Sequence, residues 1–513
     1  MKIERARNAS RNVFFGVILK INQTLMPFLM RTAIIYLMGV QYLGLNSLFT
    51  SILQVLNLAE LGVGSAMVFS IYEPIANDDV TKIRALVRLY KLYYRGIGFV
   101  IAGLGIVIIP FIPKLISGDI PSDINIYVFY LLNLGATVLS YWLFSYKNSL
   151  LQAYQRTDII SKISIIIDTF RYGSQLLVLW IFKDYYLYVI ALLVSQIVSN
   201  IVSAVVVTKM FPDYYPEGKL PQEEVKIINH HIKDLFTAKL GAVIVGSADT
   251  IVISAFLGLV ILAVYQNYYF VLTSIIAFVE VIFSACTAGI GNSLIVESKE
   301  KNFSDLKKFT FLIAWVSGVC SCCFLNLYQP FMKIWVGEGL MLDYTAVICF
   351  VIYFYVYEIN RILNTYKDAG GVWHQDRFRP LVTAMANLGM NLIMVQFWGI
   401  YGVLFSTVLS TVFIGMPWIL HNLFTTLFDK RFLREYLKSL FVYILMSLLV
   451  AILSVLICNF INMNLWLTIF LRLFVCLIIP NVIFIFAYHR KKEFSQSINL
   501  INNITKGKLS RFL

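Results

Sequence analysis

The stretch LFVYILMSLLVAILSVLIC, residues 440–458, decides the fold class. It contains no charged residue and is long enough to cross the ~30 Å hydrocarbon core of a bilayer as a helix. Similar runs recur along the whole 513-residue chain, of which 59% is hydrophobic and only 14% charged. A soluble globular chain has about 45–50% apolar and about 25% charged residues. The sequence therefore predicts an all-α polytopic membrane protein.

Fourteen transmembrane helices are predicted, at approximately residues 12–38, 44–72, 92–112, 124–146, 159–182, 185–210, 239–258, 261–293, 309–328, 344–366, 379–397, 400–420, 439–460 and 464–488. Two pairs of neighbouring spans are separated only by short segments around Gly258 and Gly399, where glycine favours tight turns. The first run contains Lys20 and Arg31 and ends without a small-residue cleavage pattern. It is therefore expected to be a retained helix and not a signal peptide.

The basic residues indicate the topology. The chain has 42 Lys and Arg against 28 Asp and Glu, a net charge of +14. In a soluble protein this excess would suggest nucleic-acid binding. Here nearly all the basic residues fall in one set of alternate links, and the other set holds only Lys114, Lys183 and Lys333. The positive-inside rule places both termini in the cytoplasm and requires an even number of spans, which fourteen or twelve would satisfy.

The two halves resemble each other at an offset of about 215–220 residues. Leu43-Gly44-Leu45 corresponds to Leu257-Gly258-Leu259, and residues 154–158 (YQRTD) correspond to residues 374–378 (HQDRF). This pattern predicts two six-helix bundles related by a pseudo-two-fold repeat, although chance similarity among apolar helices is an alternative. In transporters built from such parallel repeats, the substrate binds between the bundles. The predicted parts are residues 1–212, a linker 213–238, residues 239–422, two added helices in 423–490 and a tail 491–513.

Candidate substrate-binding cations lie within the predicted spans. Lys20 and Arg31 are eleven residues apart, about three helical turns, so they share one face of the first span. Pro27 lies between them and is expected to bend the helix. Such a helix suits a cavity wall that attracts an anion, although both side chains could instead extend to lipid headgroups. Arg171 is a further candidate for the cavity, and Asp168 can pair with it at i and i+3.

Three carboxylates within spans are candidates for ion coupling or for the cavity lining: Glu60, Asp249 and Glu280. A carboxylate in a membrane is costly and marks a functional site by default. It can bind H⁺ or Na⁺, or it can pair with a cation on another helix. Both roles remain open from the sequence. A second internal pair, Glu358 and Arg361, is expected to be neutralised and structural.

Several chemistries lack their motifs. There is no G-x-x-x-x-G-K-[ST] phosphate loop and no nucleophile motif, and Cys320-x-Cys322-Cys323 has no second ligand pair for a metal. The seven cysteines all fall in apolar runs, where packing is the expected role. The predicted outer links are too short for a folded domain. No cofactor, metal site or enzymatic activity is expected.

Three segments resemble a known family. Residues 42–49 (YLGLNSLF) and 58–66 (LAELGVGSA) are similar to the opening of bacterial polysaccharide flippases, and residues 249–258 (DTIVISAFLG) are similar to their seventh-helix signature. These flippases form the polysaccharide transport branch of the multidrug/oligosaccharidyl-lipid/polysaccharide (MOP) exporter superfamily. The resemblance implies a V-shaped, MATE-like pair of bundles in the bacterial cytoplasmic membrane. It also implies a cationic cavity that flips undecaprenyl-pyrophosphate-linked sugar repeat units by alternating access.

Two other functions remain as alternatives. A cation-coupled multidrug exporter would have the same fold, but it would favour acidic cavity residues, whereas the charges here are mixed. A membrane polysaccharide polymerase would need a large outer loop, which argues against that function, although a polymerase is a protein partner that flipping implies. The expected partners are therefore a lipid-linked oligosaccharide and membrane lipids, with H⁺ or Na⁺ as an open question and no nucleic acid.

Overall fold

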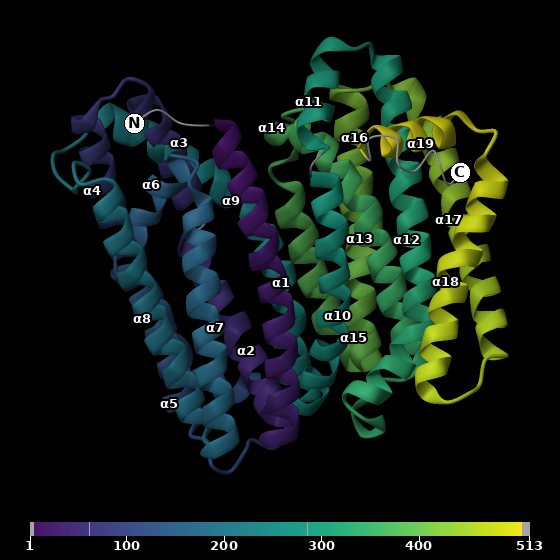
Figure 1. Cartoon of the computed structure of the whole chain (residues 1–513), viewed down its shortest axis with the longest axis horizontal. Coiled ribbons are helices and arrows are strands. Elements are labelled where there is room, and N and C mark those ends of the chain that lie inside the picture. The colour runs from purple at the N-terminus through teal and green to yellow at the C-terminus, as the bar shows by residue number, and fades with distance from the viewer. Residues whose placement is uncertain (1–4, 61, 285, 505–513) are drawn as a thin grey trace. The chain divides into compact units, whose positions relative to one another are not determined.

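Helices make up all the regular structure in the described part of the chain, which covers residues 5–60, 62–284 and 286–504 of the computed structural model. The chain folds as two compact units, residues 1–263 and 264–513 (Figure 1). The predicted all-helical class is confirmed. The sequence predicted two bundles on either side of a linker at residues 213–238. Those domain boundaries remain a prediction.

The first unit consists of nine α-helices within its described residues, together with the start of α10. They are α1 (Arg5–Leu37), α2 (Val40–Leu56), α3 (Val63–Ala76), α4 (Val80–Ile108), α5 (Ile126–Trp142), α6 (Asn148–Ala153), α7 (Thr157–Ile181), α8 (Tyr185–Met210) and α9 (Gln222–Leu257). Three short 3-10 helices join them: η1 (Asn57–Glu60), η2 (Ile109–Leu115) and η3 (Ser145–Lys147). The second predicted span is thus interrupted, because η1 separates α2 from α3.

The second unit is formed by the helices from α10 onward. They are α10 (Leu259–Ser284, which begins in the first unit), α11 (Thr287–Val296), α12 (Lys299–Trp335), α13 (Tyr344–Ala369), α14 (Trp373–Asp376), α15 (Arg379–Ser410), α16 (Met416–Thr426), α17 (Leu433–Asn459), α18 (Leu465–Tyr488) and α19 (Lys492–Ile504). The short elements are η4 (Glu338–Leu340), the π-helical η5 (Thr411–Gly415) and η6 (Lys430–Phe432).

Eleven helical segments in the described residues are long and apolar enough to cross a membrane, or twelve if the bent pair α5 and α6 forms one span. Helix α7 is not among them, because Asp168, Arg171 and Gln175 reduce its apolar character. The segment 373–426 counts once, although it is 54 residues long. The chain is therefore a multi-pass membrane protein, and the number fourteen remains a prediction.

Glycine forms the two tight turns that the sequence indicated. Gly258 has φ 90° between α9 and α10, and Gly399 has φ 52° inside α15, where the helix axis breaks. Other residues rarely adopt such positive φ values, because the Cβ atom clashes with the backbone. The chain can therefore reverse direction at these points without a longer link.

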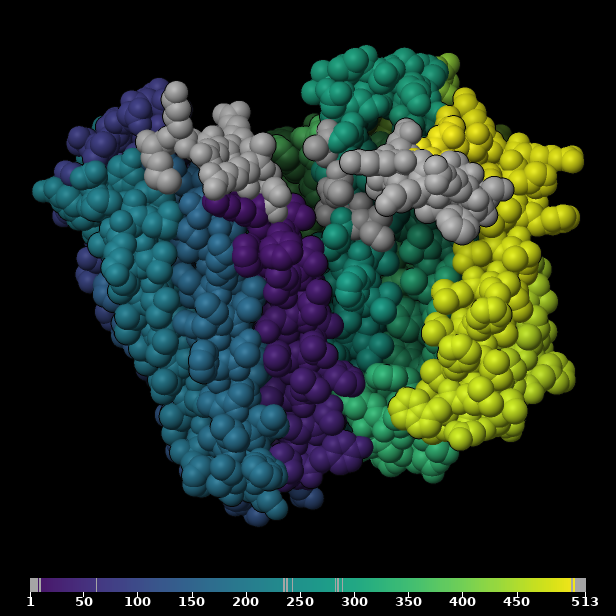
Figure 2. Space-filling view, in the orientation of Figure 1, coloured from purple at the N-terminus to yellow at the C-terminus, as the bar shows by residue number. Residues whose placement is uncertain are grey.

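The outer surface of the helices is apolar. Helix α18, yellow at the right of Figure 2, exposes Trp466, Phe470 and Phe486, which are 69%, 66% and 80% accessible. Large rings at this exposure are unfavourable in water, and contiguous exposed patches on soluble proteins are small. A hydrocarbon environment removes this cost. The exposed face of α18 is therefore a lipid-facing surface.

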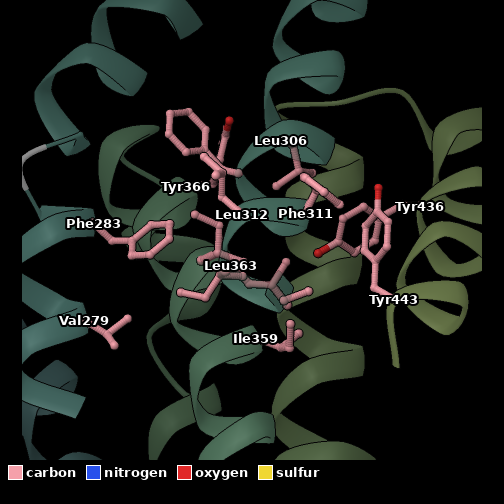
Figure 3. Close-up of a cluster of buried hydrophobic side chains, with 14 of the residues drawn as sticks. Val279, Phe283, Leu306, Phe311, Leu312, Ile359, Leu363, Tyr366, Tyr436 and Tyr443 are labelled. Carbon is pink, nitrogen blue, oxygen red and sulfur yellow. The ribbon is translucent and has the colours of Figure 1, made fainter. Parts of the chain in front are cut away.

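The core of the second unit forms where α10, α12, α13 and α17 meet. Side chains from all four helices point toward one another in Figure 3, including Phe283, Phe311, Leu363 and Tyr436. Leu306, Phe311, Leu363 and Tyr436 are completely buried. Burial of such side chains fixes the positions of α10 and α13, which carry the polar groups described below.

The two similar segments of the sequence form similar polar clusters. Asp158, at the start of α7, is fully buried, with its carboxylate 2.9 Å from Arg156 Nε and 3.3 Å from Lys162 Nζ. Asp376, just before α15, is also buried, and its carboxylate lies 2.7 Å from Arg379 Nε. A buried carboxylate needs such partners to remain charged. Each unit thus fixes the start of a long helix with a buried Asp–Arg cluster.

Close packing at Gly44 gives a first test. A Cβ atom on this α2 residue would collide with the backbone carbonyl group of Leu259 at the start of α10. We expect Gly44→Ala to destabilise the protein by about 1–3 kcal/mol, because backbone atoms must move apart. Thermal unfolding of the purified protein in detergent measures the effect.

The matched control is Gly103→Ala in α4, where a Cβ atom meets no atom within 4 Å. This change should be neutral or slightly stabilising, since alanine favours helix over glycine by up to about 1 kcal/mol. Equal thermal unfolding midpoints for the Gly44 and Gly103 variants would contradict the close packing of α2 against the start of α10.

Candidate functional site

Helices α1 and α7 lie side by side in the first unit and run in the same direction (Figure 1). Two contacts fix their register. Asn12 of α1 donates to the carbonyl group of Gln155 at 3.0 Å and accepts from the backbone N–H of Asp158 at 2.8 Å. Further along both helices, Asn22 donates to the Thr169 hydroxyl at 3.2 Å. The positions of residues along the axes of the two helices can therefore be compared directly.

Arg171 lies on α7 and pairs with Asp168, as the sequence predicted. The distance from Arg171 Nη2 to Asp168 Oδ1 is 3.1 Å, and both side chains are less than one-fifth exposed. The guanidinium group also lies 4.4 Å from the centre of the Tyr172 ring. Such a cation–π contact stabilises a cation away from water. Arg171 is thus held in a fixed position by two neighbours on its own helix.

Arg31 is half-buried on α1. Its guanidinium group interacts electrostatically with the hydroxyl groups of Tyr185 and Tyr188, at the start of α8. Tyr188 also interacts electrostatically with Arg171. The structure thus brings Arg31 and Arg171 into one region of the first unit, around a shared tyrosine. Helix α1 is continuous through Pro27, and a bend at that residue remains a prediction.

Lys20 lies nearer the N-terminus of α1 and is exposed. At 1.5 Å per residue, it is about 16 Å from Arg31 along the helix axis. The register through Asn22 and Thr169 places Arg171 about 6 Å beyond Lys20 and about 10 Å before Arg31. The three predicted cations therefore lie at three successive heights on two adjacent helices. Their role in binding substrate remains a prediction.

Glu60 lies in η1, where the second predicted span is interrupted. Tyr94 of α4 donates a hydrogen bond to its carboxylate at 2.8 Å, and Tyr90 donates to the Tyr94 hydroxyl at 2.7 Å. Lys239 of α9 interacts electrostatically with Glu60 and donates to the Ser65 hydroxyl at 3.2 Å. Broken helices in transporters commonly form ion or substrate sites at the break.

Sequence reasoning did not identify Lys239, Tyr90 or Tyr94 as members of this site. Lys239 is the first residue of the predicted span 239–258, a position at the end of a link where a basic residue is common. Tyr90 and Tyr94 are four residues apart, which places them on one helix face. That spacing is a detectable signal, but nothing in the sequence directs this face toward Glu60.

Asp249 lies in α9, and its side chain is only 8% exposed. Thr250, the next residue, and Ser254, five residues further along α9, are also buried. Ser247, two residues away, is 3.5 Å from the Gln54 side-chain oxygen of α2. Asp249 therefore belongs to a polar stretch of α9 inside the first unit.

Glu280 belongs to the second unit, where it borders a pocket of about 340 Å³ between α10, α11 and α13. The polar or aromatic residues of the lining include Glu280, Tyr357, Asn360, Arg361, Asn364 and Asp368. Arg361 Nη2 lies 3.3 Å from the fully buried carboxylate of Glu358, which confirms the predicted pair. Arg361 Nη1 also donates to the Ile276 carbonyl group of α10 at 3.1 Å. This contact joins two walls of the pocket.

Comparison with known proteins adds a family and a fold. Residues 9–288, more than half of the chain, match the family described as "Polysaccharide biosynthesis protein". A search of curated protein sequences gave no match.

Among solved structures, a lipid II flippase in an inward closed conformation is similar with a TM-score of 0.67 at 13% identity, over 93% of this chain and 99% of that one. An inward-facing multidrug resistance MATE transporter of the MOP superfamily gives 0.58 at 14% identity, over 82% and 99%. A Vibrio cholerae MATE transporter gives 0.53 at 16% identity, over 81% and 96%. The chain therefore belongs to the polysaccharide biosynthesis protein family and has the fold of the MOP-superfamily transporters.

Proposed function

We propose that this protein is a flippase. It moves undecaprenyl-pyrophosphate-linked oligosaccharide repeat units from the cytoplasmic to the outer leaflet of a bacterial cytoplasmic membrane. The family supports a role in polysaccharide biosynthesis, and one protein with this fold is described as a lipid II flippase. The observation that carries the proposal is the series of cations Lys20, Arg171 and Arg31 at successive heights on α1 and α7.

A pyrophosphate headgroup needs such a series to cross the hydrocarbon layer. Transfer of an unpaired charge into hydrocarbon is costly, so the phosphate groups need cationic partners throughout. Guanidinium groups suit this role because they form two parallel hydrogen bonds with phosphate oxygens. A pyrophosphate group is shorter than the ~16 Å between Lys20 and Arg31 along the helix. It would therefore pass from one cation to the next instead of binding all three together.

Asp168 gives this path a means of release. The carboxylate holds Arg171 when no substrate is present, at 3.1 Å. An arriving phosphate group competes with Asp168 for the same guanidinium group, so Arg171 is never left uncompensated in the membrane. The competition weakens phosphate binding and allows the headgroup to move on. An intermediate step on a transport path requires such moderate affinity.

Alternating access is the mechanism that the fold supports. The chain divides into two compact units, each with its own packed helices. Rocking of two such halves exposes a site to each side of the membrane in turn. The distribution of basic residues in the links favours a cytoplasmic location for both termini. H⁺ or Na⁺ could drive the cycle through Glu60, Asp249 or Glu280, but Glu60 is already bonded by Tyr94 and lies near Lys239.

The two alternatives receive less support. In an exporter of cationic drugs, three cations on the substrate-binding helices would repel the substrate. A polysaccharide polymerase would need catalytic groups on an outer domain. The links at 109–125 and 336–343 contain only one short 3-10 helix each. A polymerase is instead the partner that would consume the flipped repeat units.

The cation series predicts the outcome of single substitutions in cells. In cells that lack the native gene, we expect Arg31→Ala and Arg171→Ala to abolish or strongly reduce surface polysaccharide at normal protein level. The lipid-linked precursor should accumulate, because the pyrophosphate group loses a binding step. Immunoblotting, polysaccharide staining and lipid extraction measure the three quantities.

Lys114→Ala is the matched control, because it removes a cation from an exposed position in the 109–125 link. It should leave polymer production unchanged. Normal polymer in both arginine variants would refute the cationic path.

The competition between Asp168 and phosphate predicts an opposite effect on binding. Asp168→Asn should raise the affinity of the purified protein in nanodiscs for undecaprenyl pyrophosphate about tenfold, equivalent to about 1.4 kcal/mol, and should slow flipping. Titration with this lipid measures the affinity. Asp119→Asn, at an exposed outer position, removes the same charge and serves as the control. Unchanged or weaker binding by the Asp168 variant would exclude the proposed competition.

A further inference from the structure

The pocket of the second unit has the size of a small-molecule site. Its volume of about 340 Å³ lies at the lower end of the ~300–1,000 Å³ that such sites occupy. Its described lining residues come from α10, α11 and α13 of the second unit. Residues 357–368 line it from the C-terminal half of α13, which the basic links place toward the cytoplasm.

The charges around the pocket disfavour a phosphate group. The carboxylates of Glu280 and Asp368 line it, and Asp368 pairs with Lys367 Nζ at 2.9 Å. Arg361 is the cation among the described residues that line it, and Glu358 already neutralises Arg361 at 3.3 Å. An anion would therefore meet more repulsion than attraction here, in contrast to the cation series on α1 and α7.

A bare metal ion does not fit the pocket either. A cation site holds several oxygen ligands within about 2.6 Å of the ion, which leaves no room for a larger cavity. The described residues contain no group of three or more His, Cys, Asp and Glu side chains suited to a metal.

The polar groups of the lining match hydroxyl groups. Asn360 Oδ1 is a buried atom without a hydrogen-bond partner in the described part of the chain. Such an atom costs about 1–3 kcal/mol until a partner arrives. The Glu280 and Asp368 carboxylates accept hydrogen bonds, and Asn360 both donates and accepts. A hydroxyl group also does both, so neighbouring hydroxyl groups on one ring can satisfy this mixed set.

An aromatic ring completes the set. Tyr357 lines the pocket and is 41% exposed, and its ring stacks with that of Tyr353 at a centroid distance of 6.1 Å and an angle of 21°. An exposed, supported ring offers an apolar surface to the C–H face of a pyranose, while the polar groups bind its hydroxyl groups. The pocket wall is also held in place by hydrogen bonds. Asn364 accepts a 2.8 Å hydrogen bond from Arg379, and Arg379 also donates to the Asp376 carboxylate.

We infer that this pocket binds a sugar ring of the substrate through its hydroxyl groups, on the cytoplasmic side of the second unit. The inference rests on the proposed function, because the sugar belongs to the lipid-linked repeat unit. The first unit then recognises the pyrophosphate group that all such lipids share. The pocket recognises the glycan that differs among them. Glu280 acts here as a hydroxyl acceptor instead of an ion-coupling group.

Two ligands separate these roles in a binding experiment. One is undecaprenyl pyrophosphate without sugar. The other is the lipid-linked repeat unit extracted from cells in which the gene for this chain is deleted. The full-length protein in nanodiscs is titrated with each ligand, as wild type and as Asn360→Ala and Glu280→Gln. Gln396→Ala, at an exposed position on α15 outside the pocket, is the control.

Wild type should bind the sugar-bearing lipid more tightly than the bare lipid. The two pocket variants should lose about tenfold in affinity for the sugar-bearing lipid and keep their affinity for the bare lipid, with unchanged thermal unfolding. Unchanged affinity for both ligands, or an equal loss for both, overturns the sugar pocket while the flippase proposal stands. A change only in the Na⁺ or pH dependence of binding also overturns it, in favour of an ion site. Failure of the wild type to bind either lipid overturns the proposed function itself.

Discussion

The cost of placing a charge in hydrocarbon determines how this protein arranges its polar groups. Two arginines within the apolar helices have their carboxylate partners one turn away, Arg171 with Asp168 and Arg361 with Glu358. A pair on a single helix forms without help from other helices, so each segment is nearly neutral from the time it inserts. The same arrangement keeps a guanidinium group available to a ligand that can compete with the carboxylate. Local pairing therefore lowers the cost of placing the helix in the membrane and is compatible with the proposed phosphate binding.

A second constraint acts at the ends of the helices. Asp158 and Asp376 are buried at the starts of α7 and α15, and each is bonded to an arginine. Loss of one partner from a buried ion pair is far more costly than the pair itself is stabilising. These clusters therefore favour a single position for the chain where it enters a long helix. Both segments of the weak sequence repeat form such a cluster. The repeat therefore corresponds to the same structural role in each unit, which is to fix the start of a long helix.

The sequence predicted features that depend on neighbours along the chain. Apolar runs predicted the helices, and glycines predicted the turns at Gly258 and Gly399. The i, i+3 spacing predicted both internal ion pairs. It did not reveal contacts between distant segments, such as the bond from Tyr94 to Glu60 or the shared position of Tyr188 between two arginines. The pocket was also missed, because its lining comes from α10, α11 and α13. Glu280 was noticed only as an isolated carboxylate.

Separate recognition of phosphate and sugar has a consequence for specificity. All undecaprenyl-pyrophosphate-linked lipids carry the same phosphate groups, so the proposed binding by cations on α1 and α7 would contribute equally to every one of them and would not discriminate. Discrimination requires buried polar groups that a wrong substrate leaves unpaired, and such sites can reject an analogue strongly. In the proposed sugar pocket of the second unit, Asn360 is such a group. If this proposal holds, relatives that transport different sugars should differ most in the side chains on this face of α13, and least in the cations proposed to bind the phosphate.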